Sequence, residues 1–405
     1  MCGLACDDLR LTVDDQGMQA LYPTCSSSEE YFNAAWLDGQ QAIMPQINGQ
    51  SVKLADAITE ASRLLNASKA PLISGLTTDV TGARAAMALA DQYGAVVDHR
   101  DSEAMFRNLR VLQDSGWMTT TLSEVRNRAD LIVIIGNNVL ESFPRLAERV
   151  LTPQGLFVND KRKLVFIGPS PNLPANLRNA GALSIDVPLE SSVEITSILR
   201  VLMNGGKIEN PTDFPLKALS KLADSLKKAS YAVIAWSSAD FVFPHAELAV
   251  GGWCALIEDL NQTTRAAGLP LGGGHGSMSA NQVCTWQAGF PLRSSFAEGH
   301  PSHHAWRYNG TRMLLHNEAD LLVWIATLLP DEIPSTECPQ IVIGHPGMRF
   351  DKPPAVFIPV GTPGIDHAGH CFRTDGVVAL PLRQLRKSQN PSAKEVVNQI
   401  LEAAC

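Results

Sequence analysis

The chain alternates between short, continuous apolar runs and longer stretches in which apolar residues recur at helical spacing. The runs are rich in β-branched residues and end in small or polar residues, which is typical of strands buried on both faces of a parallel sheet. The predicted strands cover residues 71–75, 95–98, 131–136, 165–169, 231–236, 321–326, 341–344 and 356–360.

Helical spacing of apolar residues separates these strands. The predicted helices cover residues 51–68, 83–93, 192–204, 216–229 and 248–267. Gly94 and the pair Gly205-Gly206 stand where helices should end, because glycine readily adopts the left-handed conformation of a helix C-terminus. Strands that alternate with helices in this way predict doubly wound α/β domains with parallel sheets.

The first fifty residues have a different pattern. Alternating residues predict short strands at 9–13 and 19–22, and a turn-rich segment follows at 24–28. We therefore expect a small β-rich unit at the N-terminus.

Composition and charge narrow the functional classes. The 405 residues suffice for two to four domains, and the low charged fraction of 18% fits a surface that is partly covered by other subunits. With a net charge of −8 and no dense run of Lys and Arg, nucleic acid is not an expected partner. No apolar run approaches the roughly 18 residues that span a bilayer, and the first residues lack a basic start and an apolar stretch. We expect a cytoplasmic protein without membrane contact.

The eight cysteines are scattered, so in a reducing cytosol they are expected to be free thiols. Five of them stand far apart and are interpreted as small buried apolar residues, namely Cys254, Cys284, Cys338, Cys371 and Cys405. Cys2, Cys6 and Cys25 form a separate group.

Two glycine-containing segments are candidates for ligand contacts. Gly136-Asn137-Asn138 follows a predicted strand, and ligands of open α/β sheets gather at such strand ends. The segment lacks the three spaced glycines of a dinucleotide fingerprint, which disfavours a nicotinamide dehydrogenase. Gly272–Gly276 holds four glycines in five residues, and could either allow close approach of a ligand or chain or form a flexible crossing between domains.

Two histidine groups could bind a metal or could belong to ordinary loops. The first is His300, His303 and His304, surrounded by glycine, proline and serine; the second is His367 and His370, with Asp366 and Cys371 beside them. Neither forms an HExxH motif, and no GxSxG nucleophile elbow occurs in the chain. No local arrangement commits the chain to catalysis.

Four segments taken together resemble the B subunit of formylmethanofuran dehydrogenases, a branch of the molybdopterin oxidoreductases. They are CGLACDD at 2–8, LSEVRNRADLIVIIGNN at 122–138 with SFPR at 142–145, GHGSMSANQVCTWQAGFP at 274–291, and RTDGV at 373–377. They span nearly the whole chain, and each is modest alone but specific in combination.

The resemblance breaks at the position of the family's metal ligand. That ligand is the Cys or selenocysteine of a Cys-His-Gly-Pro segment, which binds tungsten or molybdenum as a soft anion. Ala104, Met105, Phe106 and Arg107 stand in its place, and no cysteine occurs between Cys25 and Cys254. We expect that no metal is bound there, and the old pocket near Ala104 could be plugged, empty or reused.

The family's iron–sulfur motif is also incomplete. The pattern is C-x2-C-x3-C with a fourth cysteine downstream, and here Cys2 and Cys6 supply C-x3-C while Cys25 could be the distant residue. Three thiolates hold a cluster only with a substitute ligand, so we expect no cofactor on this chain.

The resemblance implies a fold and a division into domains. The fold is molybdopterin-oxidoreductase-like α/β, with doubly wound parallel-sheet domains and the small β-rich N-terminal unit. The expected ranges are 1–50 for that unit, 51–104 with 271–355 for one α/β domain, 105–270 for an inserted Rossmann-like domain, and 356–405 for a C-terminal segment.

The losses point to a non-redox branch of the family. The chain most resembles the B subunit of a bacterial formyltransferase/hydrolase complex, in which formyl transfer and hydrolysis take place on other subunits. The expected function is a scaffold, catalytically silent by itself, in tetrahydromethanopterin-linked one-carbon metabolism. Its expected partners are the hydrolase (A-like), C-like and formyltransferase subunits.

Two alternatives remain open. The first is an active molybdenum or tungsten pterin formylmethanofuran dehydrogenase subunit with atypical ligands. The second is a stand-alone enzyme that acts on a small molecule with His367 and His370.

Overall fold

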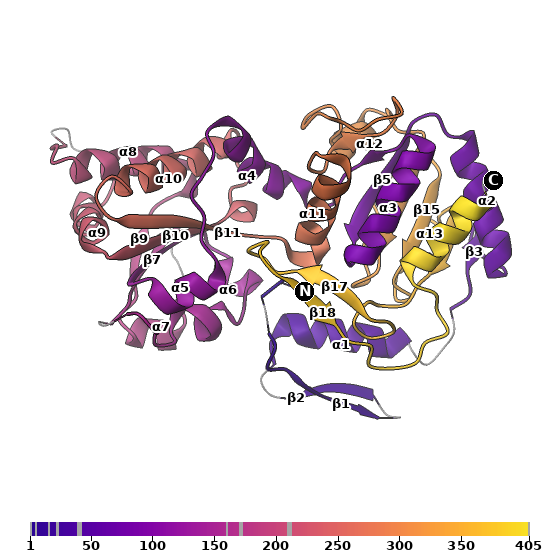
Figure 1. Ribbon diagram of the computed structural model, residues 1–405, viewed down its shortest axis with the longest axis horizontal. Helices are drawn as coiled ribbons and strands as arrows, with labels where there is room; N and C mark the ends of the chain where they lie inside the picture. Colours follow the sequence, from indigo (N-terminus) through magenta and orange to yellow (C-terminus); the bar gives the residue numbers. More distant parts are fainter. Residues whose placement is uncertain are drawn as a thin grey trace. The chain divides into compact units, whose positions relative to one another are not determined.

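The chain forms two compact units, each described by itself (Figure 1). The computed structural model describes residues 2–4, 6–14, 17–21, 24–38, 43–158, 161–169, 173–208 and 213–403. Unit 1 consists of Met1–Ser102 and Gly273–Cys405, and unit 2 is the continuous segment Glu103–Gly272 inserted into it. The stretches 1–50 and 356–405, which the sequence sets apart, fall within unit 1. The predicted domain ranges themselves stay a prediction.

Unit 1 is built on a nine-stranded sheet whose five central strands are parallel. In sheet order these are β6 (Val96–Val97), β5 (Pro71–Thr77), β14 (Leu321–Ala326), β15 (Gln340–Gly344) and β16 (Val356–Pro359). Short antiparallel strands flank them, β13 (Ser302–His303) and β12 (Ser294–Ser295) at one edge and β3 (Gln46–Ile47) and β4 (Gln50–Ser51) at the other.

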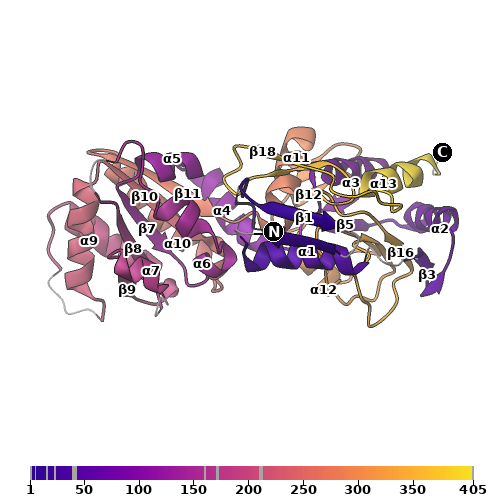
Figure 2. The ribbon, with the colours of Figure 1, turned by 90° about the horizontal axis from the view of Figure 1, so that it is seen from below.

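Helices cover both faces of this sheet (Figure 2). One face carries α2 (Leu54–Ala67), α3 (Val80–Tyr93), α11 (Ser277–Ala288) and α13 (Ala393–Glu402), which pack on one another. On the other face Met313 of α12 (Gly310–Leu315) joins Leu72, Leu322 and Phe357 of the sheet in one buried cluster. The β-branched strands are buried on both faces, as their continuous apolar pattern predicts.

The N-terminal region contains more helix than its sequence pattern predicts. Strands β1 (Arg10–Asp14) and β2 (Gly17–Leu21) pair as an antiparallel hairpin, so both predicted strands are confirmed apart from Tyr22, which lies outside the described residues. The predicted turn at 24–28 is wrong, because helix α1 (Ser26–Asp38) begins there. Its Tyr31, Phe32 and Ala35 share one helix face and are buried, and this burial outweighs the turn preference of the three serines. A second hairpin, β17 (Gly369–Phe372) and β18 (Ala379–Leu382), lies nearer the C-terminus.

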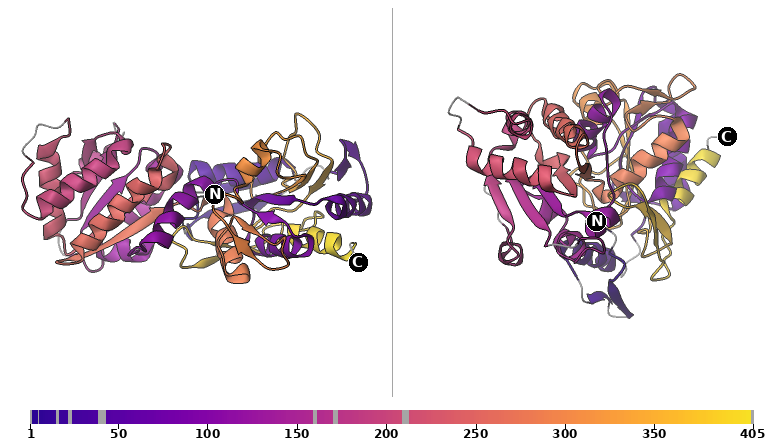
Figure 3. Two further views of the ribbon diagram at one scale, coloured as in Figure 1. Left: turned by 90° about the horizontal axis from the view of Figure 1, so that it is seen from above. Right: turned by 60° about the vertical axis from the view of Figure 1, so that its left-hand side comes forward.

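Unit 2 has a five-stranded sheet in which every strand pairs in parallel. Its order is β11 (Arg265–Leu271), β10 (Tyr231–Ser237), β7 (Leu131–Ile135), β8 (Lys163–Gly168) and β9 (Leu183–Asp186). Helices α8 (Ser192–Met203), α9 (Leu216–Lys228) and α10 (Ala246–Leu260) pack on one face, and α5 (Leu122–Arg128), α6 (Val139–Ser142) and α7 (Ala175–Asn179) lie on the other (Figures 1 and 3). Helix α4 (Ser102–Asp114) leads into the unit, and short helical turns lie at Ala147–Leu151, Leu189–Ser191 and Ser238–Asp240.

The predicted fold class is confirmed, since all eight predicted strands are present and each pairs in parallel with a neighbour. Gly94 ends α3 with a φ of 64°, and Gly205 follows α8 with a φ of 76°. Within the described residues, every helix is too short or too polar to cross a membrane.

The predicted helix at 248–267 is wrong at its C-terminal end. Helix α10 stops at Leu260, and β11 begins only five residues later at Arg265. The side chain of Asn261 causes the stop, because its amide donates to the carbonyls of Ile257 and Ala266 (both 2.8 Å) and its oxygen accepts from the Ala266 N–H (3.1 Å). The Asn261 side chain thus forms hydrogen bonds that stabilise a turn, and the helix does not continue beyond Leu260.

Replacing Asn261 by alanine is expected to lower the free energy of unfolding by about 1–3 kcal/mol, because three half-buried hydrogen bonds lose their partner. Urea unfolding measures the change. Gln262→Ala, at the exposed neighbour, is the control and should change little. Equal effects of the two substitutions would contradict this role of Asn261.

Candidate functional site

The candidate site of unit 1 lies where the chain order of its parallel strands reverses, between β5 and β14. Ligands of open α/β sheets bind at the carboxyl ends of strands beside such a reversal. Here the backbone N–H of Thr327 donates to the carbonyl of Thr77 (2.8 Å), and the hydroxyl of Thr327 donates to the hydroxyl of Thr78 (2.9 Å). All three residues are buried, so the two strand ends are fastened to each other.

Gly276 packs against the backbone of Thr78, just after the end of β5. A Cβ atom at Gly276, whose φ is +81°, would lie 2.4 Å from the carbonyl oxygen of Thr78. The glycine segment 272–276 therefore allows a close approach of two stretches of unit 1. The predicted approach of a ligand or another chain stays a prediction. The other role, a crossing between domains, also agrees with its position, because unit 2 ends at Gly272.

Asp79, two residues after the end of β5, is the N-cap of helix α3. Its carboxylate accepts from the backbone N–H groups of Gly82 (3.0 Å) and Thr81 (3.2 Å) and from the Thr81 hydroxyl (2.6 Å). A carboxylate at this position satisfies the free N–H groups of the first turn. The carboxylate of Asp79 therefore serves to cap helix α3.

Three of the four resemblance segments meet in this region of unit 1. The backbone N–H of Thr374 donates to the carbonyl of Gly3 (2.9 Å), which joins the C-terminal segment to the N-terminal one. The N–H of Phe372, just before the C-terminal segment, donates to the hydroxyl of Ser279 in the glycine-rich segment (2.9 Å). Segments far apart in sequence thus build one structure. The fourth segment, 122–138, belongs to unit 2.

A buried ion pair lies under the end of β6. The Nε of Arg293 is 3.5 Å from Oδ2 of Asp98, and both residues are almost fully buried. Arg293 also donates to the hydroxyl of Ser102 (2.9 Å) and the carbonyl of Ala305 (2.8 Å), while Asp98 accepts from the Gly310 N–H (2.8 Å). Burial raises the pKa of Asp98, and Arg293 and the hydrogen bonds offset part of that rise.

His99, the next residue, is buried in its neutral form. Its Nδ1 accepts from the backbone N–H of Asp101 (2.9 Å), so the ring proton resides on Nε2. Burial lowers the pKa of His99 to about 4, with a smaller opposing effect from Asp101. His275 Nδ1 of the glycine segment lies 3.8 Å from Oδ2 of Asp101.

His99 is expected to make the protein less stable in acid. Its folded-state pKa is lowered from 6.5 to about 4, so its contribution is complete above pH 6.5 and is lost as the pH falls toward 4. Each pKa unit corresponds to about 1.4 kcal/mol, so the loss reaches on the order of 3 kcal/mol. Urea unfolding at pH 7 and pH 4.5 should show a smaller difference for His99→Gln than for the unmodified chain. His316→Gln, at an exposed position, should leave the difference unchanged.

The segment that replaces the family's metal ligand lies in helix α4. Ala104 and Met105 are half-buried, and Phe106 is fully buried. Arg107 donates to the carbonyl of Ser238 (2.8 Å). The next side chain, Asn108, donates to the Ser238 hydroxyl (3.2 Å) and accepts from the indole N–H of Trp236 (2.9 Å). Helix α4 is thereby bonded to the carboxyl end of β10.

The strand reversal of unit 2 lies between β7 and β10, and its polar groups also bond one another. Asp240 accepts from the backbone N–H of Asn138 (2.9 Å), and burial raises the pKa of Asp240 while these bonds lower it. A Cβ at Gly136 would lie 2.4 Å from Oδ2 of Asp240. The predicted ligand-contact segment 136–138 is therefore correctly placed at a strand end, but Asp240 fills the space next to it.

The two predicted histidine groups do not converge. In the first, His304 Nδ1 accepts from the N–H of Arg307 (3.0 Å), and the His303 ring stacks on Phe290 at 6.1 Å. In the second, both ring nitrogens of His367 face backbone carbonyls, and His370 is exposed on β17. Among the described residues, no three His, Cys, Asp or Glu side chains are grouped so that they could hold a metal ion.

The cysteines divide as the sequence predicts, with one difference. Cys254, Cys284 and Cys371 are buried, and burial raises the pKa of each thiol to about 12. Cys338 is only half-buried, since it lies in the loop before β15, and Cys405 lies outside the described residues. The N-terminal group, Cys2, Cys6 and Cys25, is half-buried, and burial raises the pKa of Cys2.

Sequence reasoning missed the network of Asp98, His99 and Arg293. The available signal was a set of charged or polar residues next to predicted strands, but nothing in the sequence pairs residues almost two hundred positions apart.

Comparisons with known proteins agree with the resemblance. No family model matches the chain. The B subunit of the tungsten-containing formylmethanofuran dehydrogenase 2 of Methanocaldococcus jannaschii is 26% identical, over 96% of this chain and 92% of that protein. The B subunit of the formyltransferase/hydrolase complex Fhc of Methylorubrum extorquens is 29% identical, over 82% of this chain and 89% of that protein.

A solved structure shares the fold. It is a chain of the formyltransferase/hydrolase complex FhcABCD of Methylorubrum extorquens with methylofuran, and it matches 89% of this chain and 98% of its own length at 26% identity and a TM-score of 0.79. The chain is therefore a homologue of the B subunits of formylmethanofuran dehydrogenase and of the Fhc complex.

Proposed function

We propose that the chain is a non-redox scaffold subunit of a cytoplasmic formyltransferase/hydrolase complex in tetrahydromethanopterin-linked one-carbon metabolism. Its partners are the hydrolase (A-like), C-like and formyltransferase subunits, and the formyl chemistry takes place on them. The match to a subunit of the FhcABCD complex, over most of both chains, supports the role as a subunit. The local structure at 104–108 supports the loss of redox chemistry.

The residues around position 104 do not fit the family's metal. The family's tungsten or molybdenum site uses a soft anionic protein ligand, and the methyl group of Ala104 supplies none. The side chains that follow in α4 are engaged elsewhere: Phe106 in the interior, Arg107 with the Ser238 carbonyl and Asn108 with Trp236. The bonds of Arg107 and Asn108 within unit 2 support a structural role for this segment.

The N-terminal thiols do not fit the family's cluster either. Cys2, Cys6 and Cys25 supply three ligands where four are needed. Both redox centres of the family thus lack ligands in this chain.

Native mass spectrometry of the complex, isolated through a tag on this chain, tests the proposal. We expect the chain together with A-like, C-like and formyltransferase subunits, and substoichiometric tungsten, molybdenum and iron in the same sample. The isolated chain should show no formyl transfer or hydrolysis, while the whole complex shows both.

Cys2→Ser/Cys6→Ser is the matched variant. It should assemble like the unmodified chain and contain the same trace of iron. Stoichiometric tungsten or molybdenum would instead support the formylmethanofuran dehydrogenase alternative, which the tungsten-containing relatives favour. A soluble monomer that turns over a substrate alone would support the stand-alone enzyme.

A further inference from the structure

The five-stranded sheet of unit 2 has an open edge at β9. This strand pairs with β8 on one side, and no described strand pairs with its other side. At the opposite edge β11 is covered, because the Gly268 N–H donates to the Met118 carbonyl (2.7 Å) and the Gly268 carbonyl accepts from Thr120 (3.0 Å). An exposed row of backbone N–H and C=O groups can accept a further strand.

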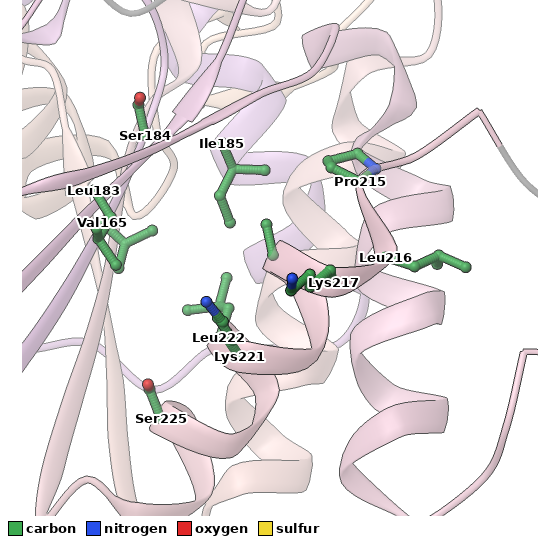
Figure 4. A pocket seen from close by; sticks show the side chains of 11 residues that line it. Val165, Leu183, Ser184, Ile185, Pro215, Leu216, Lys217, Lys221, Leu222 and Ser225 are labelled. Carbon is green, nitrogen blue, oxygen red and sulfur yellow. The ribbon is translucent and has the colours of Figure 1, made fainter.

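A groove runs beside this edge, between the sheet and helix α9 (Figure 4). The groove is open to solvent and has a volume of about 510 Å³. Val165 and Leu183, directly opposite in the β8–β9 pairing, form its floor with Ile185, and Leu222 of α9 forms part of its wall. The Leu183 side chain is 61% exposed, which is unusual for a leucine in a strand of a well-packed sheet. The groove is apolar and large enough to receive side chains of another segment.

The charged side chains that line the groove are all positive. Lys217 and Lys221, one helical turn apart on α9, line it, and Figure 4 shows both on the part of α9 that faces β8 and β9. No acidic side chain is among the described residues that line it, although the whole chain carries a net charge of −8. Lysines often protect an edge strand from aggregation when they stand on that strand. Here the strand, Leu-Ser-Ile-Asp, carries none, and the lysines stand on the helix above it.

We propose that this groove binds an extended acidic segment of a partner subunit, which adds to the sheet as a strand beside β9. Backbone hydrogen bonds to β9 supply the attachment, an apolar side chain of the segment covers Leu183, and its carboxylates pair with Lys217 and Lys221. The inference rests on the proposed function, because it assumes that the chain works within a complex.

Hydrogen–deuterium exchange, followed by mass spectrometry, tests the attachment on the full chain alone and in the purified complex. Peptides that cover Leu183–Asp186 and the first turns of α9 should exchange more slowly in the complex. Two groove variants, Leu183→Asp and Lys217→Glu/Lys221→Glu, should bind the partner at least about tenfold more weakly, and the charge reversal should reduce the dependence of binding on salt.

Matched controls separate the groove from general effects. Lys227→Glu/Lys228→Glu reverses two charges on the last turn of the same helix, outside the groove, and Leu156→Asp places a charge at another exposed leucine of unit 2. Both should assemble like the unmodified chain. Unfolding curves of the isolated variants show whether each still folds.

The outcomes distinguish the inference from the proposed function. If the complex forms but exchange at Leu183–Asp186 is unchanged and the groove variants assemble normally, the groove inference is wrong and the scaffold proposal stands. If the unmodified chain forms no complex, both are overturned. A concentration-dependent homodimer that Leu183→Asp abolishes would overturn the partner segment in favour of a second copy of this chain.

Discussion

Replacing Arg293 by methionine is expected to lower the free energy of unfolding at pH 7 by about 3–5 kcal/mol. The substitution keeps most of the apolar volume but leaves the carboxylate of Asp98 buried without its cation. It also removes the donors to Ser102 and Ala305. Urea unfolding of the full chain measures the change.

The pH dependence identifies the cause of this loss. Burial already raises the pKa of Asp98, and removal of Arg293 raises it further. A carboxyl group whose folded-state pKa lies above its unfolded value binds protons more tightly in the folded state, so stability falls as the pH rises. Acidification should therefore reduce the difference in stability between Arg293→Met and the unmodified chain. The loss of stability from His99 in acid is the same in both proteins, so it cancels in this difference.

Asp98→Asn/Arg293→Met is the control for the buried charge. It removes both charges, so it should lose less stability at pH 7 than Arg293→Met alone. If the double variant were the less stable protein at pH 7, the ion pair would not be the source of the effect.

Gly276→Ala is expected to destabilise the chain by about 2–5 kcal/mol. The left-handed backbone at a φ of +81° costs an alanine roughly 1–2 kcal/mol, and the overlap of its Cβ with the Thr78 carbonyl oxygen at 2.4 Å adds about 1–3 kcal/mol. The oxygen belongs to the backbone at the end of β5, which is fastened to β14 and cannot easily move away. Thermal and urea unfolding measure the loss.

Gly272→Ala is the matched control in the same segment. A Cβ at Gly272 meets nothing within 4 Å, and its φ is not in the left-handed region. This variant should retain nearly full stability. Similar losses for both glycines would show that flexibility of the whole segment matters, and not the close approach at Gly276.

The sequence predicted most of the framework because continuous apolar runs are a local signal. All eight runs became strands, whereas β9 and β11 were missed because they contain polar or small residues. The end of α10 depends on one amide, that of Asn261, which a periodicity cannot reveal. Helix α1 was missed because its serines favour turns, and only its burial against other segments makes it a helix.

The candidate site was predictable only in part. The loss of the metal ligand at Ala104 follows from residue types alone, and the motif segments indicated which parts of the chain belong together. What replaces the ligand depends on contacts over long separations: Arg107 and Asn108 bond to Ser238, 130 or more positions away. Such pairings arise from the fold and leave no mark in the local sequence.

The insertion of unit 2 sets an order for folding during synthesis. Strands β5 and β6 leave the ribosome early, but β14, the neighbour of β5, is separated from it by the whole of Glu103–Gly272. Unit 2 is continuous and can complete its own sheet first, while β5 waits with an unpaired apolar edge. The nascent chain is therefore most prone to aggregation, and most in need of a chaperone, until β14 has emerged.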